Sequence, residues 1–253
     1  QQPREIKSFY GKILQENGNK FNDSLRLYKR FIVGSKYLKE RVLQENKTIS
    51  EHNILIIPTC VDYDTFAPKE YNSKNNEIVF GWIGGNHNLH YLKMLIEPLN
   101  KIFEEQKIKL VVSAGKIYTN DKAKFSIENK KWSLATEKDI IRSFDIGLMP
   151  IEDNSVGKGK CGFKLLQYMG LGVVSIATNV SINSEIIEHG KNSFLVNNDN
   201  SNWYEILKFA INQKTYFSKI GNLAKQTVKE RYSFTSNKDK IIKYLTIWVY
   251  SAK

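Results

Sequence analysis

Apolar positions along the chain form short unbroken runs that alternate with longer segments in which they recur every three or four residues. The unbroken runs predict strands at residues 30–34, 53–58, 78–83, 109–113, 146–149, 173–177 and 194–196. The periodic segments predict helices at residues 5–15, 37–44, 89–106, 137–144, 163–170, 184–188, 203–213, 217–230 and 237–250. From residue 78 onward, strands without a period of two alternate with helices. This order predicts an α/β fold, with a Rossmann-like parallel sheet and helices on both of its faces.

Local signals and chain length suggest how these elements are divided. Ser35 lies just ahead of the helix predicted at residues 37–44, and serine is a favoured N-cap residue. Residues 69–76 are mostly polar and precede the regular alternation, which makes them the best candidate for a linker. With 253 residues, 41% of them hydrophobic, the chain can form one large domain or two modest ones with a sizeable core.

The charge balance predicts a surface that attracts anions. Lysine and arginine number 38 against 26 aspartate and glutamate, a formal net charge of +12. Such a surface suits nucleotides, phosphorylated or acidic sugars, nucleic acid or an anionic membrane. Because the basic runs are short and scattered and no nucleic-acid-binding motif is present, we expect no nucleic acid partner.

Cysteine usage and the absence of targeting signals point to the cytoplasm. Cys60 and Cys161 lie far apart without a CxxC motif, so we expect neither a disulfide framework nor a zinc site. The sequence has no run of 18 apolar residues and no apolar signal core near its start. Since it begins with Gln1 rather than Met, we expect a fragment or a processed chain.

A glycine turn after the strand at 78–83 is the first candidate for ligand contact. Gly84 and Gly85 link this strand to a helix, where free backbone N–H groups and the helix dipole favour an anion. The turn lacks the GxGxxG pattern of dinucleotide cofactors, and a tight turn without a ligand is the alternative. His87 is a candidate for contact with a sugar phosphate. It shares a helical face with His90 but has no third ligand nearby, so we predict no metal site.

A glycine- and lysine-rich loop before a second helix is the more informative segment. The N–H groups of Gly162 and Phe163 would point out of this helix start, where they suit a phosphate. Lys160 and Lys164 lie one turn apart on the same side and can neutralise a diphosphate. Gln167 follows on the same face, where its amide can bind ribose hydroxyls. The alternative is a solvated basic helix face.

The segment 160–174, with Asn183–Ile187 and Gly190–Val196 after it, resembles the donor domain of the retaining family 4 glycosyltransferases, which have the GT-B fold. Residues 35–38 and 57–62 resemble the end of the N-terminal domain and its crossover, so the resemblance covers nearly the whole chain.

The resemblance implies three parts. Residues 1–68 are a remnant of the N-terminal acceptor domain with the crossover. Residues 69–235 are the nucleotide-sugar donor-binding domain, and residues 236–253 form a C-terminal helix that returns toward the N-terminal domain.

The sequence departs from this family at its characteristic glutamates. The family carries two glutamates eight positions apart, and Gly159 and Gln167 occupy these places here. Val174 replaces the usual proline, and the usual Arg and Lys pair is missing after the first glycine turn. A lysine-rich branch of the family has the pattern Lys-Cys-Gly-Phe-Lys. Lys160 and Lys164 are therefore expected to replace the positive pair and to act as the catalytic residues, stabilising the leaving diphosphate.

Two further donor-site candidates each have a structural alternative. Glu185 matches the downstream glutamate of the family, but Ser184 as an N-cap with Glu185 on the helix dipole explains the same residues. Trp132 occupies the stretch in which related donor domains meet the base, and core packing is the alternative for a tryptophan.

The function implied by the resemblance is transfer of a hexose from a nucleoside-diphosphate sugar to an acceptor hydroxyl, in polysaccharide or glycan synthesis. It implies retention of anomeric configuration, a glycan or lipid-linked acceptor, and neither a cofactor nor a metal ion. A GT-B-fold sugar-nucleotide epimerase and a non-catalytic nucleotide-sugar-binding module remain alternatives. The second alternative is favoured by the loss of both glutamates.

The last predicted helix carries one apolar stripe, formed by Ile241, Ile242, Leu245, Trp248 and Val249. Such a stripe usually packs against protein, here against the N-terminal domain. Contact with the inner face of the membrane is the alternative, because three lysines lie nearby on the same helix.

Overall fold

The computed structural model describes residues 20, 22–71 and 76–251, with side chains up to residue 246. The helix expected at residues 5–15 lies outside these ranges. The chain divides into two compact units, Gln1–Pro58 and Thr59–Lys253. The assignment of residues 1–68 to an acceptor domain and its crossover stays a prediction.

The first unit is a small βαβ arrangement. Residues 22–27 are helical, and the elements that follow are β1 (Phe31–Val33), α2 (Lys36–Glu45), a 3₁₀ turn (Glu51–Asn53) and β2 (Ile54–Ile56). The two strands pair in parallel, with Phe31 opposite Ile54. The Ser35 hydroxyl accepts a hydrogen bond of 3.3 Å from the Leu38 N–H, which confirms the predicted N-cap.

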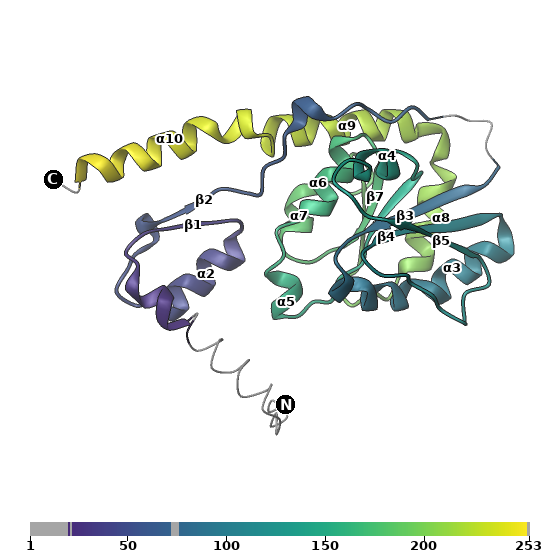
Figure 1. Cartoon of the computed structure of the whole chain (residues 1–253), viewed down its shortest axis with the longest axis horizontal. Helices are drawn as coiled ribbons and strands as arrows, with labels where there is room; N and C mark the ends of the chain where they lie inside the picture. The colour runs from purple at the N-terminus through teal and green to yellow at the C-terminus, as the bar shows by residue number, and fades with distance from the viewer. Residues whose placement is uncertain (1–19, 21, 72–75, 252–253) are drawn as a thin grey trace, which may run out of the picture. The chain divides into compact units, whose positions relative to one another are not determined.

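The second unit is built on a six-stranded sheet in which every pairing is parallel (Figure 1). Its strands are β3 (Ile78–Ile83), β4 (Ile108–Ala114), β5 (Ser126–Lys131), β6 (Ile146–Met149), β7 (Val174–Thr178) and β8 (Phe194–Val196). Their spatial order is β5-β4-β3-β6-β7-β8. The chain therefore runs outward from β3, returns to the other side of β3 at β6, and leaves a crevice between the carboxyl ends of these two strands.

Helices cover both faces of this sheet, as predicted (Figure 1). The α-helices of the second unit are α3 (Lys93–Glu105), α4 (Glu137–Arg142), α5 (Ser155–Lys158), α6 (Phe163–Gly170), α7 (Ile182–Ile186), α8 (Trp203–Asn212), α9 (Phe217–Arg231) and α10 (Phe234–Ser251). α3 and α8 share one core cluster, in which Leu99 and Leu207 are buried. α4, α6 and α9 contribute to the clusters on the other face, where Ile141, Leu166 and Val228 are buried.

The helix and strand boundaries predicted from the apolar pattern are wrong where a turn or a polar edge strand takes the place of an apolar repeat. The helix expected at 89–106 is a 3₁₀ segment, Asn86–Leu92, followed by α3. The structure also contains β5 and α5, which the apolar pattern did not predict. α7 begins before Ser184, whose hydroxyl donates to the Ser181 carbonyl, so the predicted N-cap at Ser184 is wrong.

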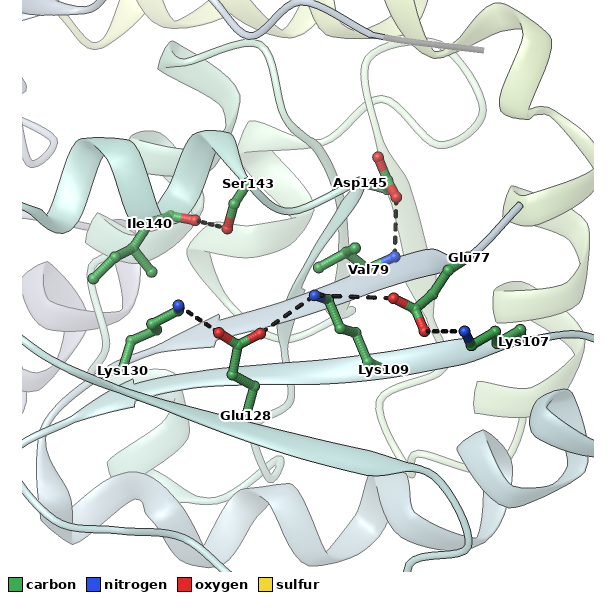
Figure 2. A network of polar contacts seen from close by, with 9 residues as sticks. All are labelled: Glu77, Val79, Lys107, Lys109, Glu128, Lys130, Ile140, Ser143 and Asp145. Atoms are coloured by element: carbon green, nitrogen blue, oxygen red, sulfur yellow. Dashed lines mark hydrogen bonds and ion pairs between the residues drawn. The ribbon is translucent and has the colours of Figure 1, made fainter. Parts of the chain in front are cut away.

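A charged network joins the outer strands at the β5 edge (Figure 2). Glu128 of β5 accepts a hydrogen bond of 3.3 Å from Lys109 of β4 and also pairs with Lys130. Just before β6, the Asp145 carboxylate accepts a 2.9 Å bond from the Val79 N–H and so joins the starts of β6 and β3. Charged side chains on an edge strand disfavour pairing with another chain.

The apolar stripe predicted for the last helix lies on α10. Ile242 and Leu245 are exposed, while Trp248 and Val249 lie beyond the described side chains. Within the described residues, no helix is both long and apolar enough to span a bilayer. α10 packs against α9, and its contact with the N-terminal domain or with a membrane stays a prediction.

Candidate functional site

A cavity of about 560 Å³ lies at the carboxyl ends of β3 and β6, in the crevice that the strand order predicts. Its walls come from the turn after β3, the ends of β4, β5 and β6, and the first turns of α4 and α6. All of these elements belong to the second unit. The volume falls in the range of small-molecule sites, about 300–1,000 Å³.

The cavity brings together most of the residues singled out in the sequence. Those that line it are Gly84, Gly85, Trp132, Lys160, Gly162, Phe163, Lys164 and Gln167. Two predicted donor-binding residues, His87 and Glu185, are not part of the lining. The roles assigned to all ten residues stay predictions.

The glycine turn after β3 makes room for a lysine from another element. A Cβ on Gly84 would lie 2.5 Å from Cε of Lys164 and 2.6 Å from the Trp82 ring, so only glycine fits without a shift. The Gly84 N–H donates to the Ser113 carbonyl at 3.0 Å. This amide is therefore not free for an anion, contrary to the expectation for this turn, and the contribution of Gly84 is space.

His87 lies at the rim of this turn. It is exposed, and its Nε2 lies 3.1 Å from the side-chain nitrogen of Asn88. Nδ1 of His90 lies 2.8 Å from the backbone carbonyl oxygen of His87, so the His90 ring contacts the backbone of His87 rather than its ring. In the described part of the chain, no group of three or more His, Cys, Asp or Glu residues could hold a metal ion.

Gly162 sets the start of α6. Its φ of +70° is left-handed, and a Cβ there would lie 2.6 Å from Cδ1 of Ile186. Both features favour glycine. Since the first amides of a helix lack intrahelical acceptors, the first turn of α6, with half-exposed Phe163, presents N–H groups on the cavity side.

Two lysine side chains enter the cavity from this loop and helix. Lys160 donates a hydrogen bond of 2.9 Å from Nζ to Oδ1 of Asn88 and lies 5.4 Å from the Tyr91 ring centroid. Nζ of Lys164 lies 5.6 Å from the Trp82 ring centroid. Among the described residues, neither the Lys160 nor the Lys164 ammonium group forms an ion pair.

The electrostatics of this lysine pair are unusual for a basic protein surface. Burial, and to a smaller extent the neighbouring charge of Lys160, lowers the pKa of Lys164 to about 8. Burial also lowers the pKa of Lys160. Because desolvation and like charge both oppose protonation, an anion between the two ammonium groups would be favourable.

Trp132, Glu137 and Gln167 form a hydrogen-bonded group on the cavity wall. Nε1 of Trp132 donates to Oε2 of Glu137 at 2.9 Å, and Nε2 of Gln167 donates to Oε1 at 3.1 Å. Trp132 is 46% exposed, which rules out the core-packing alternative, whereas Glu137 is 9% and Gln167 is 6% exposed. All three line the cavity.

Glu137 and Cys161 line the cavity although the sequence did not suggest them. Glu137 was interpreted only as the first residue of a helix, where an acidic side chain suits the dipole. The available signal was its place shortly after Trp132, at the start of a helix that follows a predicted base-contact segment. Cys161 stood inside the lysine-rich loop and was considered only for disulfide and metal chemistry.

Gly159 and Val174, which replace residues of the family pattern, each have an ordinary place in the fold. Gly159 follows the short helix α5 as its C-cap, and Val174 begins β7 with its side chain fully buried. Glu185 lies on α7, and its backbone carbonyl accepts a 3.0 Å bond from Arg231. Position 159 therefore supplies no carboxylate to the cavity.

The family model for glycosyl transferases group 1 matches residues 77–212, which include every residue lining the cavity. The chain belongs to this family. No curated protein matches the sequence.

Several solved structures share the fold of this chain. A glycosyltransferase from Rickettsia africae ESF-5 aligns over 89% of this chain and 66% of its own, with a TM-score of 0.71 and 17% identity. HepE from Anabaena, solved with UDP and glucose, aligns over 89% of this chain and 67% of its own, with a TM-score of 0.69 and 14% identity.

TarM, from S. aureus, aligns over 96% of this chain but only 47% of its own, with a TM-score of 0.65 and 20% identity. The chain thus spans about half to two thirds of the glycosyltransferases that it matches. At these identities the likeness carries the fold alone.

Proposed function

We propose that this chain binds a nucleoside-diphosphate sugar in the cavity and serves as the donor-binding part of a glycosyltransferase. The observation that carries the proposal is the lysine pair. Lys160 and Lys164 enter one cavity beside the start of α6, and burial lowers the pKa of both. A diphosphate would restore the usual protonation of both side chains and bind the amides of the helix start.

The reaction in this proposal breaks the bond between the anomeric carbon and the β-phosphate oxygen. The oxygen of an acceptor hydroxyl forms the new bond to that carbon, and its proton passes to an oxygen of the leaving diphosphate. The nucleoside diphosphate leaves with the electron pair of the broken bond. Lys160 and Lys164 stabilise the charge that develops on the leaving diphosphate, which is the step at which electrostatic stabilisation acts.

The finer features of the proposal come from the family resemblance and from the neighbours. Retention of configuration and transfer of a hexose follow the resemblance to family 4 and its lysine-rich branch. The two ammonium groups supply the positive charge, so the proposal requires no metal ion. Because HepE was solved with UDP and glucose, UDP-sugars are the first donors to test. The acceptor is a glycan or a lipid-linked glycan.

Isothermal titration calorimetry with UDP-, GDP- and ADP-sugars tests the binding claim. One donor is expected to bind, and the double variant Lys160→Ala with Lys164→Ala is expected to abolish its binding. Lys158→Ala is the matched control, because Lys158 is 43% exposed, pairs with Asp153 and does not line the cavity. The proposal fails if the folded protein binds none of the donors, or if the double variant binds as tightly as the control.

A non-catalytic nucleotide-sugar-binding module is the second candidate. It is favoured by Gly159, which stands where the family places a carboxylate near the donor sugar. Both candidates predict donor binding, and only the transferase predicts release of the nucleoside diphosphate from a bound donor in the presence of an acceptor. An assay for the released nucleoside diphosphate, run with a panel of glycan acceptors, separates the transferase from the non-catalytic module. The Lys164→Ala variant is the inactive reference.

A further inference from the structure

The carboxylate of Glu137 is buried in the cavity wall without a cationic partner among the described residues. It is 9% exposed and accepts hydrogen bonds from two neutral donors, Trp132 and Gln167. An ionised carboxylate buried in this way is stable only when donors satisfy its oxygens. Each carboxylate oxygen can accept about two hydrogen bonds, so Glu137 has capacity for ligand donors on both oxygens.

The groups around Glu137 are arranged in the order of the parts of a nucleoside diphosphate. Trp132, a half-exposed aromatic ring, lies on one side and suits a planar base. On the other side Gln167 follows Lys164 by one turn of α6, and Lys164 begins the proposed diphosphate site. The carboxylate therefore lies between the place for a base and the place for a diphosphate, where a nucleotide carries its ribose.

A ribose offers two hydroxyl donors on neighbouring carbons, and a carboxylate offers two acceptor oxygens that can take one hydrogen bond from each. We infer that Glu137 binds the ribose diol of the donor nucleotide and makes the site selective for ribonucleotides over 2′-deoxyribonucleotides. Gln167, which occupies the glutamate position of the family, acts by orienting Glu137 through the 3.1 Å hydrogen bond. The charged acceptor thus comes from α4 instead of α6. This inference rests on the proposed function, since it requires a nucleotide in the cavity.

The selectivity of the site gives a direct test. The probes are the tightest binder among UDP, GDP and ADP and its 2′-deoxy counterpart, titrated by calorimetry. Because a hydrogen bond to a charged acceptor is worth more than a neutral one, the wild-type chain is expected to prefer the ribonucleotide by roughly tenfold or more. In Glu137→Gln this ratio is expected to fall to about twofold or threefold.

The ratio of the affinities for the ribonucleotide and the 2′-deoxyribonucleotide separates recognition of the ribose from general electrostatic and structural effects. Removing a negative charge strengthens the attraction of both nucleotides to the lysine pair by the same factor, so this effect cancels. Asp139→Asn on the same helix is the matched control, because Asp139 is 69% exposed and pairs with Arg142. It removes the same charge outside the cavity and is expected to leave the ratio unchanged. Glu137→Asp keeps the charge but draws it back by one methylene, and it carries the test if Glu137→Gln does not fold.

Three results would overturn the inference. The first is an unchanged ratio in a folded Glu137 variant. The second is a wild-type chain that binds both nucleotides equally. The third is a Glu137→Gln variant that loses affinity for the sugar derivative of that nucleotide while its affinity for the nucleotide itself stays the same, because the carboxylate would then bind hydroxyls of the donor sugar. In each of these cases the nucleotide still binds, so the proposed function survives. If no nucleotide binds the wild-type chain, the proposed function fails together with this inference.

Discussion

The lowered pKa of Lys164 makes a quantitative prediction about donor binding and pH. Its side chain has a pKa of about 8 in the free protein because of burial and the nearby charge of Lys160. A bound diphosphate stabilises the ammonium form and raises this pKa. Above about pH 8, binding must therefore be accompanied by uptake of a proton, and the affinity falls as the pH rises.

The size of the effect follows from the two protonation states. With a pKa of about 8, Lys164 is about nine-tenths protonated at pH 7 and about one-tenth protonated at pH 9. If the bound lysine remains charged throughout, the affinity falls about tenfold between these two values, or about 1.4 kcal/mol. Lys160, whose pKa is also lowered by burial, changes the affinity in the same direction.

Calorimetry of one nucleotide sugar at pH 7, 8 and 9 measures this slope. A nucleotide sugar is the proper ligand because its diphosphate diester keeps its charge over this range. Repeating the titrations in buffers of different ionisation enthalpy counts the protons taken up. Lys164→Ala should bind weakly with a much flatter profile, and Lys158→Ala should follow the wild type. Affinity that is constant from pH 7 to pH 9 in the wild-type chain, with no proton uptake, would refute a role for a neutral Lys164 in the free site.

Four further results are expected. Lys164→Met raises the free energy of unfolding at pH 7 by up to about 3 kcal/mol, because the lowered pKa reflects the free-energy cost of burying a charged lysine. Urea titrations should show this gain in stability shrinking above pH 8. Gly84→Ala weakens donor binding roughly tenfold in calorimetry, since the new Cβ displaces the Lys164 side chain, whereas unchanged affinity would argue against that close approach. Gly162→Ala lowers the free energy of unfolding by about 1–3 kcal/mol in urea, from its left-handed φ and the contact with a neighbouring isoleucine, and a loss near zero would contradict both. In a Cys60→Ser background, a bound nucleotide sugar slows alkylation of Cys161 as followed by mass spectrometry, and an unchanged rate would place the ligand outside the cavity.

The apolar pattern predicted five of the six strands of the central sheet. β3, β6 and β8 have the predicted bounds, because each is a run of apolar residues between polar or glycine-rich segments. A parallel sheet buried on both faces requires such runs, so the fold class followed from the same pattern. The order of strands, by contrast, depends on pairing between distant segments and was not contained in any local pattern.

β5 shows the limit of this reasoning most clearly. Its residues, Ser126–Lys131, are mostly polar and largely exposed, and its hydrogen bonds to β4 alone make it a strand. An edge strand has one paired side and is free to carry charge, so neither apolar runs nor a period of two reveals it.

The sequence predicted the part of the candidate site whose residues lie close together along the chain. The glycines and lysines of the loop before α6 lie together in sequence, and the chemistry of a helix start indicates an anion there. Glu137, in contrast, reaches the cavity only because α4 packs beside α6, and its partners Trp132 and Gln167 come from two different segments. The sequence places Glu137 near Trp132, but its hydrogen bond with Gln167 is visible only in three dimensions.

A crystal structure of this chain with its tightest nucleoside-diphosphate sugar tests the central claim most directly. The account predicts the diphosphate between Nζ of Lys160 and Nζ of Lys164, within hydrogen-bonding distance of both, beside the first turn of α6 and with the ribose at Glu137. A diphosphate bound anywhere outside this cavity, or inside it without contact to either lysine, would contradict the account.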